Sequence, residues 1–441
     1  MDVTKFSERA DDIASYTSRK GADDVIVNAF STDSRQIRFS ESRQDIFKRW
    51  NQTYFHIFLA KERRVVSTTV KGWEDYRRIV DAAIRTAELS QPSDDYMGIA
   101  SVTSARSRRK GWKPQSDAAL GELVTRAVNA SAENGAARAA GTLYNTFAEH
   151  YLTSSAGISR HENGSSLYLS IRCFADEQAS GHSVISSLSE TRFRPEKAAE
   201  KAAGLAVLAR NPVRGDEGRF DSLLDPMVVA TLTSEAGSMC SAFNVMSGFS
   251  CFEGKLGRRV ASEAVSIDDD ATRNLSGKRY FDDEGVAVRK TALISRGVLK
   301  HYLHNTSTAR RMKERSTGNA GLIAPEAFSI SMKGGREGWR EMLSGMRDGL
   351  YINNVWYTRY QNRRAGTFST IPRDAILRVR RGEITGAVRD IRVTENLINI
   401  LKHVSAVSME REHVSWWLES YTPSTVPYAL VRKVNITRSA D

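Results

Sequence analysis

Cysteine is scarce in this chain of 441 residues, and the three cysteines present, Cys173, Cys240 and Cys251, form no CxxC or CxxxC pair. An odd number of widely spaced thiols predicts neither a disulfide framework nor a thiolate zinc knuckle, so we expect reduced core cysteines. No apolar run reaches the length of about 18 residues that spans a bilayer, and the N-terminus, MDVTKFSERADD, has no apolar stretch. These absences predict a folded, cytoplasmic protein without a membrane partner.

Several familiar catalytic signatures are also missing. The sequence contains no GxSxG elbow, no P-loop and no GxGxxG after a predicted strand. Histidine occurs eight times, and the only close pair is His301 and His304 in KHYLH. On a strand these two side chains would point to opposite faces, and on a helix they would share one. The flanking residues favour a strand, so we interpret the pair as surface or core histidines and not as a metal site.

Acidic residues are outnumbered by basic ones, 52 to 64, and the net charge is +12. The basic residues form three short clusters: Arg106, Arg108, Arg109, Lys110 and Lys113; Arg310, Arg311, Lys313 and Arg315; Arg378, Arg380 and Arg381. None accompanies a helix-turn-helix, zinc-finger or RNP signature, and a basic patch alone supports only salt-sensitive attraction. We therefore expect solvated faces and no specific nucleic-acid partner. An anionic partner stays open, as does a role as a basic nucleic-acid-associated modulator.

The hydrophobic pattern predicts an α+β protein of three domains. Residues 1–90 form an α/β unit with a mixed sheet, in which Trp73 and the apolar residues after it recur at helical spacing. Residues 115–212 combine helices and hairpins, and alternation at Leu167, Leu169, Ile171 and Cys173 predicts one buried face. Residues 220–441 are β-rich, with hairpin turns at Arg296-Gly297 and Gly382-Glu383.

The stretch TLTSEAGSMCSAF, residues 231–243, has nearly the pattern of a zinc-peptidase helix. Such a helix places a Glu between two imidazoles at fixed offsets, but here Ser234 and Met239 occupy those positions beside Glu235. Catalytic zinc needs three imidazole, thiolate or carboxylate ligands and an open position for water, and a hydroxyl or thioether cannot replace them. Apolar residues also recur as in an ordinary core helix: Leu232, Ala236, Met239, Cys240 and Phe243.

Three ordered motifs in the last third of the chain carry a family resemblance. They are GKLGRRVASEAVSIDDD (254–270), the segment from YFDDEGVAVRK to STGNA (280–320) and the segment from GTFSTIPRD to LKHV (366–404). Together they resemble the TldD/PmbA family, also described as modulators of DNA gyrase. The segments GADDVIVNAFSTDSRQIRF and SSAGISRHENGSSLYLSIRCFA are similar to the family's earlier domains, so the resemblance covers nearly the whole chain.

The resemblance implies one of two kinds of subunit. TldD-type members carry an HExxxH zinc helix and are metallopeptidases, whereas PmbA or TldE-type members lack these ligands and pair with the first type around a chamber that receives unfolded peptides. The HExxxH motif falls on Ser234 to Met239, so only its Glu, Glu235, is kept, and the late Cys of catalytic members is also missing. We therefore expect a non-catalytic subunit without a metal or cofactor of its own, with zinc only in a TldD-type partner.

Two features of this resemblance leave alternatives open. The polar turn Ser316, Thr317, Gly318 and Asn319 either lines the chamber or simply supplies positive-φ backbone. Partnership with a TldD-type paralogue gives a heterodimer, and self-association gives a homodimer. A rival hypothesis is a zinc metallopeptidase in its own right, which would use displaced ligands such as Glu235, Cys240 and a distant His.

Overall fold

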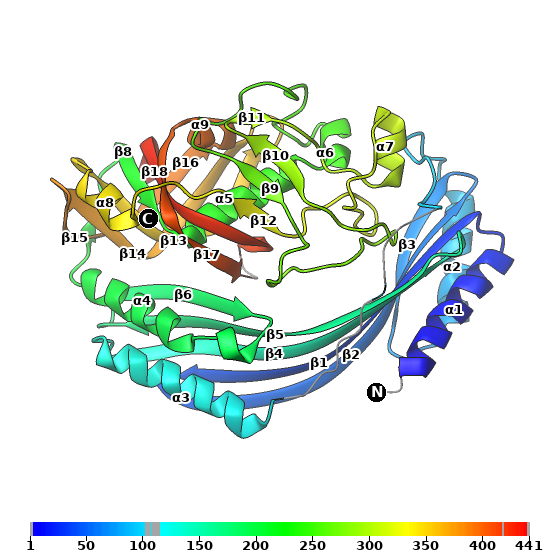
Figure 1. The fold of residues 1–441 in the computed structure, drawn as a ribbon, viewed down its shortest axis with the longest axis horizontal. Coiled ribbons are helices and arrows are strands. Elements are labelled where there is room, and N and C mark those ends of the chain that lie inside the picture. The colour runs from blue at the N-terminus through cyan, green and yellow to red at the C-terminus, as the bar shows by residue number, and fades with distance from the viewer. Residues whose placement is uncertain (1–2, 102–106, 108–114, 417–418, 439–441) are drawn as a thin grey trace.

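The computed structural model describes residues 3–101, 107, 115–416 and 419–438. Its first sheet has six antiparallel strands in the order β3-β2-β1-β4-β5-β6. The strands are β1 (Asp24–Ser40), β2 (Arg43–Lys61), β3 (Arg64–Lys71), β4 (Arg138–Ser154), β5 (Ser159–Phe174) and β6 (Ser180–Ser187). Pairing of β1 with β4 joins the N-terminal and central segments into one long curved layer, with the C-terminal part facing its inner side (Figure 1).

Four helices cover the first sheet. They are α1 (Val3–Arg19), α2 (Tyr76–Leu89), α3 (Asp117–Glu133) and α4 (Pro195–Leu208). Alternation along β1 explains their position, because Val25, Val27 and Ala29 share a buried cluster with α1 and α2. On the opposite face, Ile26 packs in a cluster with Phe281 of the C-terminal part. The predicted alternation on β5 is confirmed, since all four alternating residues from Leu167 to Cys173 are buried.

The C-terminal part contains a mixed sheet of twelve strands with the main order β11-β10-β9-β12-β18-β8-β13-β14-β15-β7, and β16 and β17 pair with β18. The strands are β7 (Val213–Arg214), β8 (Gly218–Leu224), β9 (Ile267–Asp269), β10 (Thr291–Ser295), β11 (Val298–Leu299), β12 (Ile330–Met332), β13 (Asp348–Asn362), β14 (Thr367–Arg380), β15 (Glu383–Arg389), β16 (Ile391–Asn396), β17 (Val404–Trp416) and β18 (Ser420–Arg438). This β-rich part and the helix-covered first sheet confirm the predicted α+β class.

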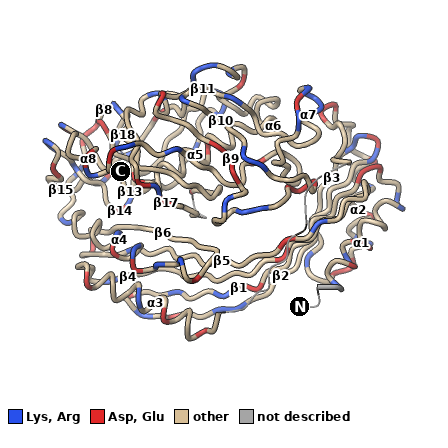
Figure 2. The backbone as a smooth tube through the Cα atoms, viewed as in Figure 1, with Lys and Arg blue, Asp and Glu red and all other residues tan. Residues whose placement is uncertain are grey.

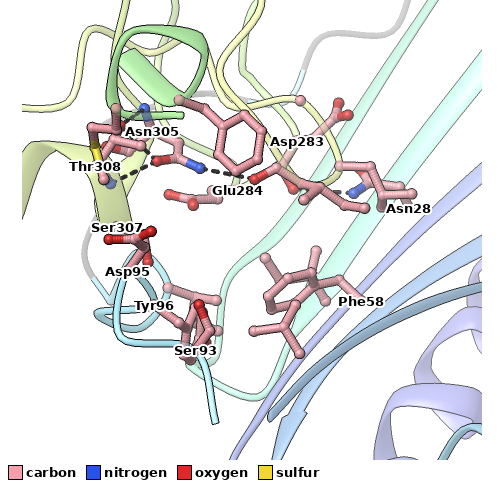
Figure 3. Close-up of a pocket in the computed structure, with 18 residues that line it drawn as sticks. Asn28, Phe58, Ser93, Asp95, Tyr96, Asp283, Glu284, Asn305, Ser307 and Thr308 are labelled. Carbon is pink, nitrogen blue, oxygen red and sulfur yellow. Dashed lines mark hydrogen bonds between the residues drawn. The ribbon is translucent and has the colours of Figure 1, made fainter. Parts of the chain in front are cut away.

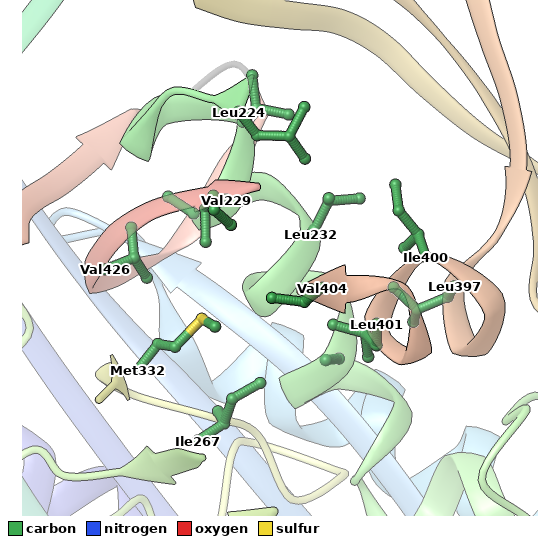
Figure 4. Close-up of a cluster of buried hydrophobic side chains, with 14 of the residues drawn as sticks. Leu224, Val229, Leu232, Ile267, Met332, Leu397, Ile400, Leu401, Val404 and Val426 are labelled. Atoms are coloured by element: carbon green, nitrogen blue, oxygen red, sulfur yellow. The ribbon is translucent and has the colours of Figure 1, made fainter. Parts of the chain in front are cut away.

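Six helical segments complete the described chain: η1 (Glu190–Arg192), α5 (Pro226–Met239), α6 (Ala242–Met246), α7 (Thr306–Met312), α8 (Trp339–Ser344) and α9 (Leu397–Lys402). Helix α5 packs on β18 and β13, and its apolar residues meet those of β9, β12, α9 and β17 in the largest buried cluster (Figure 4). None of the helices in the described residues combines the length and hydropathy needed to cross a bilayer.

Both predicted C-terminal hairpins are present. Arg296 and Gly297 form the first turn, with φ of 45° and 79°. The second turn consists of Arg381 and Gly382, with φ of 52° and 79°, so the predicted turn position lies one residue too late. Two successive positive φ angles match the right-handed twist of the flanking strands. At Gly382 a side chain is excluded, because a Cβ would lie 2.2 Å from the Ser344 carbonyl oxygen.

A buried polar junction connects β6 of the first sheet to β13 and β14. The backbone N–H of His182 donates to the Asn353 side chain (2.9 Å), and Asn353 Nδ2 donates to the His182 carbonyl (3.1 Å). Asn354 Nδ2 lies 2.9 Å from His182 Nδ1 and donates to Asp374 (2.7 Å). Asp374 also pairs with Arg172 of β5 at 2.8 Å. These contacts fix the first sheet against the C-terminal part.

Candidate functional site

Contacts of Asp225 and Pro226 hold the N-terminal end of helix α5 in place. Asp225 caps its N-terminus by accepting from the Met227 N–H (3.0 Å), and Pro226 occupies the first turn. The same carboxylate pairs with Lys201 of α4 (2.8 Å) and accepts from the Tyr351 hydroxyl (2.6 Å). All but two residues of the helix are buried, which confirms a core helix here. The prediction that Phe243 belongs to its buried face was wrong, because the helix ends at Met239 and Phe243 lies in α6, where it is 36% exposed.

Ser234 and Met239 are both committed to packing within the protein. The Ser234 side chain is 6% exposed, and its Oγ accepts a hydrogen bond from the Thr422 N–H (3.2 Å) at the start of β18. Met239 is fully buried in the same apolar cluster as the residues shown in Figure 4. A bonded hydroxyl and a buried thioether therefore stand where the resemblance places the two imidazoles, and neither is a suitable zinc ligand.

Glu235 is the one residue of the HExxxH motif that this chain keeps. Burial raises the pKa of its carboxyl, the nearby charge of Glu419 raises it further, and Arg363 and Arg359 oppose both effects. Its Oε2 is buried without a hydrogen-bond partner, and no ion pair to Glu235 occurs within the described residues. Arg363 instead donates to the Ser238 hydroxyl (3.3 Å). Glu235 Oε2 thus lies near the charges of Arg363 and Arg359 but has no hydrogen-bond partner.

A β-bulge in β13 shapes the surface beside Glu235. The register with β14 shifts between Trp356 and Arg359, and Tyr357 has a left-handed φ of 57°. The buried carboxylate of Glu419 stabilises this bulge by accepting from the N–H groups of Tyr357 (2.7 Å) and Thr358 (3.0 Å). Such a bulge redirects side chains near a site, and here it leaves Tyr357 50% exposed. The surroundings offer aromatic and cationic contacts but no metal-ligand set.

The cysteines near α5 do not supply alternative ligands. Cys240 and Cys251 are buried, and burial raises the pKa of both thiols, that of Cys251 to about 11. The thiolate that binds zinc is therefore disfavoured at neutral pH. Within residues 3–101, 107, 115–416 and 419–438, no group of three His, Cys, Asp or Glu side chains is arranged to hold a metal ion. The residues around Glu235 do not fit zinc.

The polar turn at residues 316–319 is largely buried. Thr317 Oγ1 accepts from the His304 N–H (2.8 Å), and Asn319 Nδ2 donates to Asp269 (2.5 Å). Gly318 has a φ of 73°, and a Cβ there would lie 2.4 Å from the Ala287 carbonyl oxygen. These contacts explain Thr317, Gly318 and Asn319 as parts of a structural turn. Contact of Ser316 to Asn319 with a peptide stays a prediction.

A groove of about 810 Å³ lies between the first sheet and the C-terminal part. Phe30, His150 and Glu162 line it from the sheet, and Arg279 and Tyr280 line it from the opposite side. The His150 ring stacks on Phe30 with centroids 4.2 Å apart, and Glu162 accepts from the Tyr280 N–H (2.8 Å). Sequence reasoning missed this groove because its walls come from segments more than a hundred residues apart and no single motif spans them.

The basic clusters are partly used inside the protein. Arg310 donates to the Met97 carbonyl (2.6 Å), Arg311 pairs with Asp95 (3.5 Å), and Arg378 pairs with Asp216. The cluster from Arg106 to Lys113 falls on residues 106 and 108–113, which lie outside the described residues. Elsewhere, Lys and Arg are spread over both parts of the molecule and interspersed with acidic residues (Figure 2). The second and third predicted basic clusters are thus at least partly paired with carbonyl and carboxylate groups of the protein itself.

Comparison with known proteins agrees with this architecture. The chain is 34% identical over 219 residues to a metalloprotease of Methanocaldococcus jannaschii, a match that covers 48% of each chain. It thus spans about half the length of the curated relatives it matches. The crystal structure of TldE from Thermococcus kodakarensis has a TM-score of 0.83 at 18% identity, covering 97% of this chain and 99% of that one.

A Thermotoga maritima protein whose name describes it as a modulator of a DNA gyrase has a TM-score of 0.82 at 21% identity, covering 98% and 100% of the two chains. At these identities the structural likeness shows the shared fold. The family of the PmbA/TldA metallopeptidase C-terminal domain matches residues 217–438, which is half of this chain. With its motifs, its fold and this match in agreement, the chain belongs to the TldD/PmbA metallopeptidase family.

Proposed function

We propose that this chain is a non-catalytic, PmbA/TldE-like subunit of a TldD/TldE-type metallopeptidase complex. The observation that carries the proposal is the state of the two ligand positions, where Ser234 bonds to Thr422 and Met239 lies in the core. Membership of the family supports the metallopeptidase setting. In this proposal zinc and the hydrolytic step belong to a TldD-type partner, and this chain helps to enclose the chamber that receives unfolded peptides.

The groove is the part of the chain that we assign to the peptide. An unfolded peptide presents backbone N–H and C=O groups together with side chains of every kind, so a general binding surface needs polar and aromatic groups in combination. The groove combines Phe30 and Tyr280 with His150, Glu162 and Arg279. Ser316 to Asn319 are assigned to the chamber wall only as part of this proposal.

The partner that this proposal requires is a TldD-type paralogue, with a homodimer as the alternative. A chamber needs two halves, and a chain without zinc ligands can contribute only one half of an active enzyme. Mixing the purified chain with the paralogue should give a species with the summed mass in light scattering. A homodimer that persists in the mixture would contradict the heterodimer.

Peptide cleavage tests the proposal directly. The chain alone should leave an unfolded peptide intact and should contain far less than one zinc ion per chain by elemental analysis. The mixture with the paralogue should cut the peptide, and Glu235→Gln in this chain should leave that activity unchanged. The matched control is the same Glu→Gln change in the HExxxH motif of the paralogue, which should abolish cleavage because that Glu is the general base.

The rival hypothesis, a metallopeptidase with displaced ligands, makes the opposite predictions. Stoichiometric zinc in the isolated chain, or loss of the mixture's activity in the Glu235→Gln variant, would overturn the non-catalytic assignment. Both measurements use the complete chain.

A further inference from the structure

A second cavity, distinct from the groove and from the surface beside Glu235, lies between the first sheet and loops of the C-terminal part. It has a volume of about 130 Å³, and its walls come from β1, β2 and β3, from residues 93–99, from α6 and from residues 283–284, 305–308 and 321–323 (Figure 3). Of the residues lining the groove, only Asp283 also lines this cavity. Its size suits a single side chain or a small ligand, not a length of polypeptide.

Most of the cavity wall is apolar. Ile26 and Phe58 line it from the first sheet, Ile99 from the following segment, and Phe243 from α6. Two of its apolar side chains are also open to solvent, because Phe243 is 36% exposed and Ile323 is 55% exposed. An aliphatic stem that entered beside these residues would bury apolar surface on both sides, which favours binding.

One carboxyl in this wall has no cationic partner. Glu284 is only 7% exposed, and its Oε2 accepts hydrogen bonds from the backbone N–H and the hydroxyl of Thr306. Among the described residues no Lys, Arg or His forms an ion pair with it. Burial and the neighbouring Asp282 raise the pKa of Glu284, as expected for a carboxyl that lacks a counter-ion.

The charged groups close to Glu284 are already engaged. Asp283 pairs with Arg279 at 2.6 Å, and Asp95 pairs with Arg311 at 3.5 Å. Arg310, the nearest cation to act on Glu284, donates to the Met97 and Ile99 carbonyls instead. A buried carboxyl that faces an apolar cavity without an internal counter-ion is a typical candidate for ligand recognition.

We propose that this cavity binds a basic side chain of a polypeptide, Lys or Arg, with the aliphatic stem between the apolar walls and the cationic head at Glu284. Charge complementarity selects this occupant, because a neutral apolar side chain would leave the carboxyl without a counter-ion, whereas an anion would be repelled by ionised Glu284. The chemistry required is an ammonium or guanidinium group on an aliphatic stem. The assignment does not depend on whether the chain is catalytic.

Two isosteric probes test the proposal on the complete chain. N-acetyl-lysine-N-methylamide carries the ammonium group, and N-acetyl-norleucine-N-methylamide has a similar stem without it. At pH 9, above the raised pKa of Glu284 of about 8, the lysine probe should bind at least about tenfold more tightly, because a charge-assisted hydrogen bond to a buried carboxylate favours it. Glu284→Gln should remove this preference and leave norleucine binding unchanged. Equal affinity of the two probes for the wild-type chain would overturn the proposal.

Control variants separate recognition from folding. Asp95→Asn removes a carboxylate at the cavity that is already paired with Arg311, so it should keep most of the preference. Phe243→Ser should weaken both probes, because it removes apolar wall from a partly exposed position. If Glu284→Gln does not fold, NMR shifts of residues 282–285 in the wild-type chain decide instead: they should move with the lysine probe and not with norleucine. Tighter binding of free pentylammonium than of the lysine probe would overturn the polypeptide assignment.

Discussion

Protonation of His182 should weaken the junction between the two sheets. The ring is 3% exposed, and its Nδ1 faces Asn354 Nδ2, a donor, at 2.9 Å. Nδ1 must therefore accept, so Nε2 carries the proton and donates to the Ser170 hydroxyl (2.9 Å). The ring also packs edge-on against Trp416, with centroids 5.1 Å apart. This arrangement requires the neutral form, because a protonated ring would lose the acceptor at Nδ1.

Burial lowers the pKa of His182 from 6.5 to about 4, against the opposing effect of Asp374 and with a smaller lowering from Arg172 and Lys201. Between these two pH values the unfolded chain binds a proton that the folded chain does not. The stabilisation is therefore complete above pH 6.5 and declines as the pH falls toward 4. For a single site with these two pKa values, the loss at pH 4.5 amounts to about 2.5 kcal/mol.

Urea unfolding at pH 7.5 and pH 4.5 measures this loss. The wild-type chain should lose about 2.5 kcal/mol more than His182→Gln between the two pH values, because Gln has no proton to bind. Titrating groups remote from His182, such as His413 with a pKa lowered to about 4, are present in both proteins and cancel in the difference. The reasoning would be refuted by equal pH dependence in the two proteins.

Three further changes test other parts of the structure by urea unfolding. Gly318→Ala should lower the free energy of unfolding by about 2–4 kcal/mol, because it adds left-handed backbone strain and a clash with the backbone. Gly254→Ala, at a φ of 66° with open space around it, should lower it by only about 1 kcal/mol. Equal losses in the two variants would contradict the clash. Lys201→Met should lower the free energy of unfolding by about 3–5 kcal/mol, because it leaves the buried Asp225 without its cation. A loss below about 1 kcal/mol would show that this ion pair is not needed for stability. Because burial raises the pKa of Glu235, the stability of Glu235→Gln relative to wild type should increase as the pH rises above the ordinary Glu value; a difference that stays constant from pH 4 to 8 would exclude this effect.

Local patterns in the sequence were sufficient for the elements that depend on them. The helical spacing that starts at Trp73 predicted α2, although the helix begins at Tyr76 and Trp73 lies outside it, 58% exposed. The alternation from Leu167 to Cys173 predicted a strand with one buried face. Apolar spacing around α5 predicted a core helix at the position that the family resemblance gives to the zinc helix. These predictions succeeded because the period of the apolar residues directly reports which face of a helix or strand is buried.

Contacts between distant segments could not be predicted from the same patterns. The pairing of β1 with β4, which joins two predicted domains in one sheet, depends on register and not on local spacing. The bulge at Tyr357 requires Glu419, which lies sixty residues further along the chain and belongs to no recognisable motif. The carboxyl of Glu284 stands out only in three dimensions, where no Lys, Arg or His among the described residues forms an ion pair with it. Function at such sites arises from tertiary placement, which a single sequence does not display.

The two residues at the positions that the family resemblance assigns to zinc ligands help to hold helix α5 in place. A structural or catalytic metal ties segments together, and a protein that lacks it must hold them by other contacts. Here Ser234 bonds to Thr422 of β18, while Met239 adds a fully buried side chain, worth about 1.5–3 kcal/mol of apolar burial. Asp225 fixes the other end of the helix through its cap and ion pair. Glu235 takes part in none of these contacts, so the helix is positioned by its cap, its ion pair and its packing.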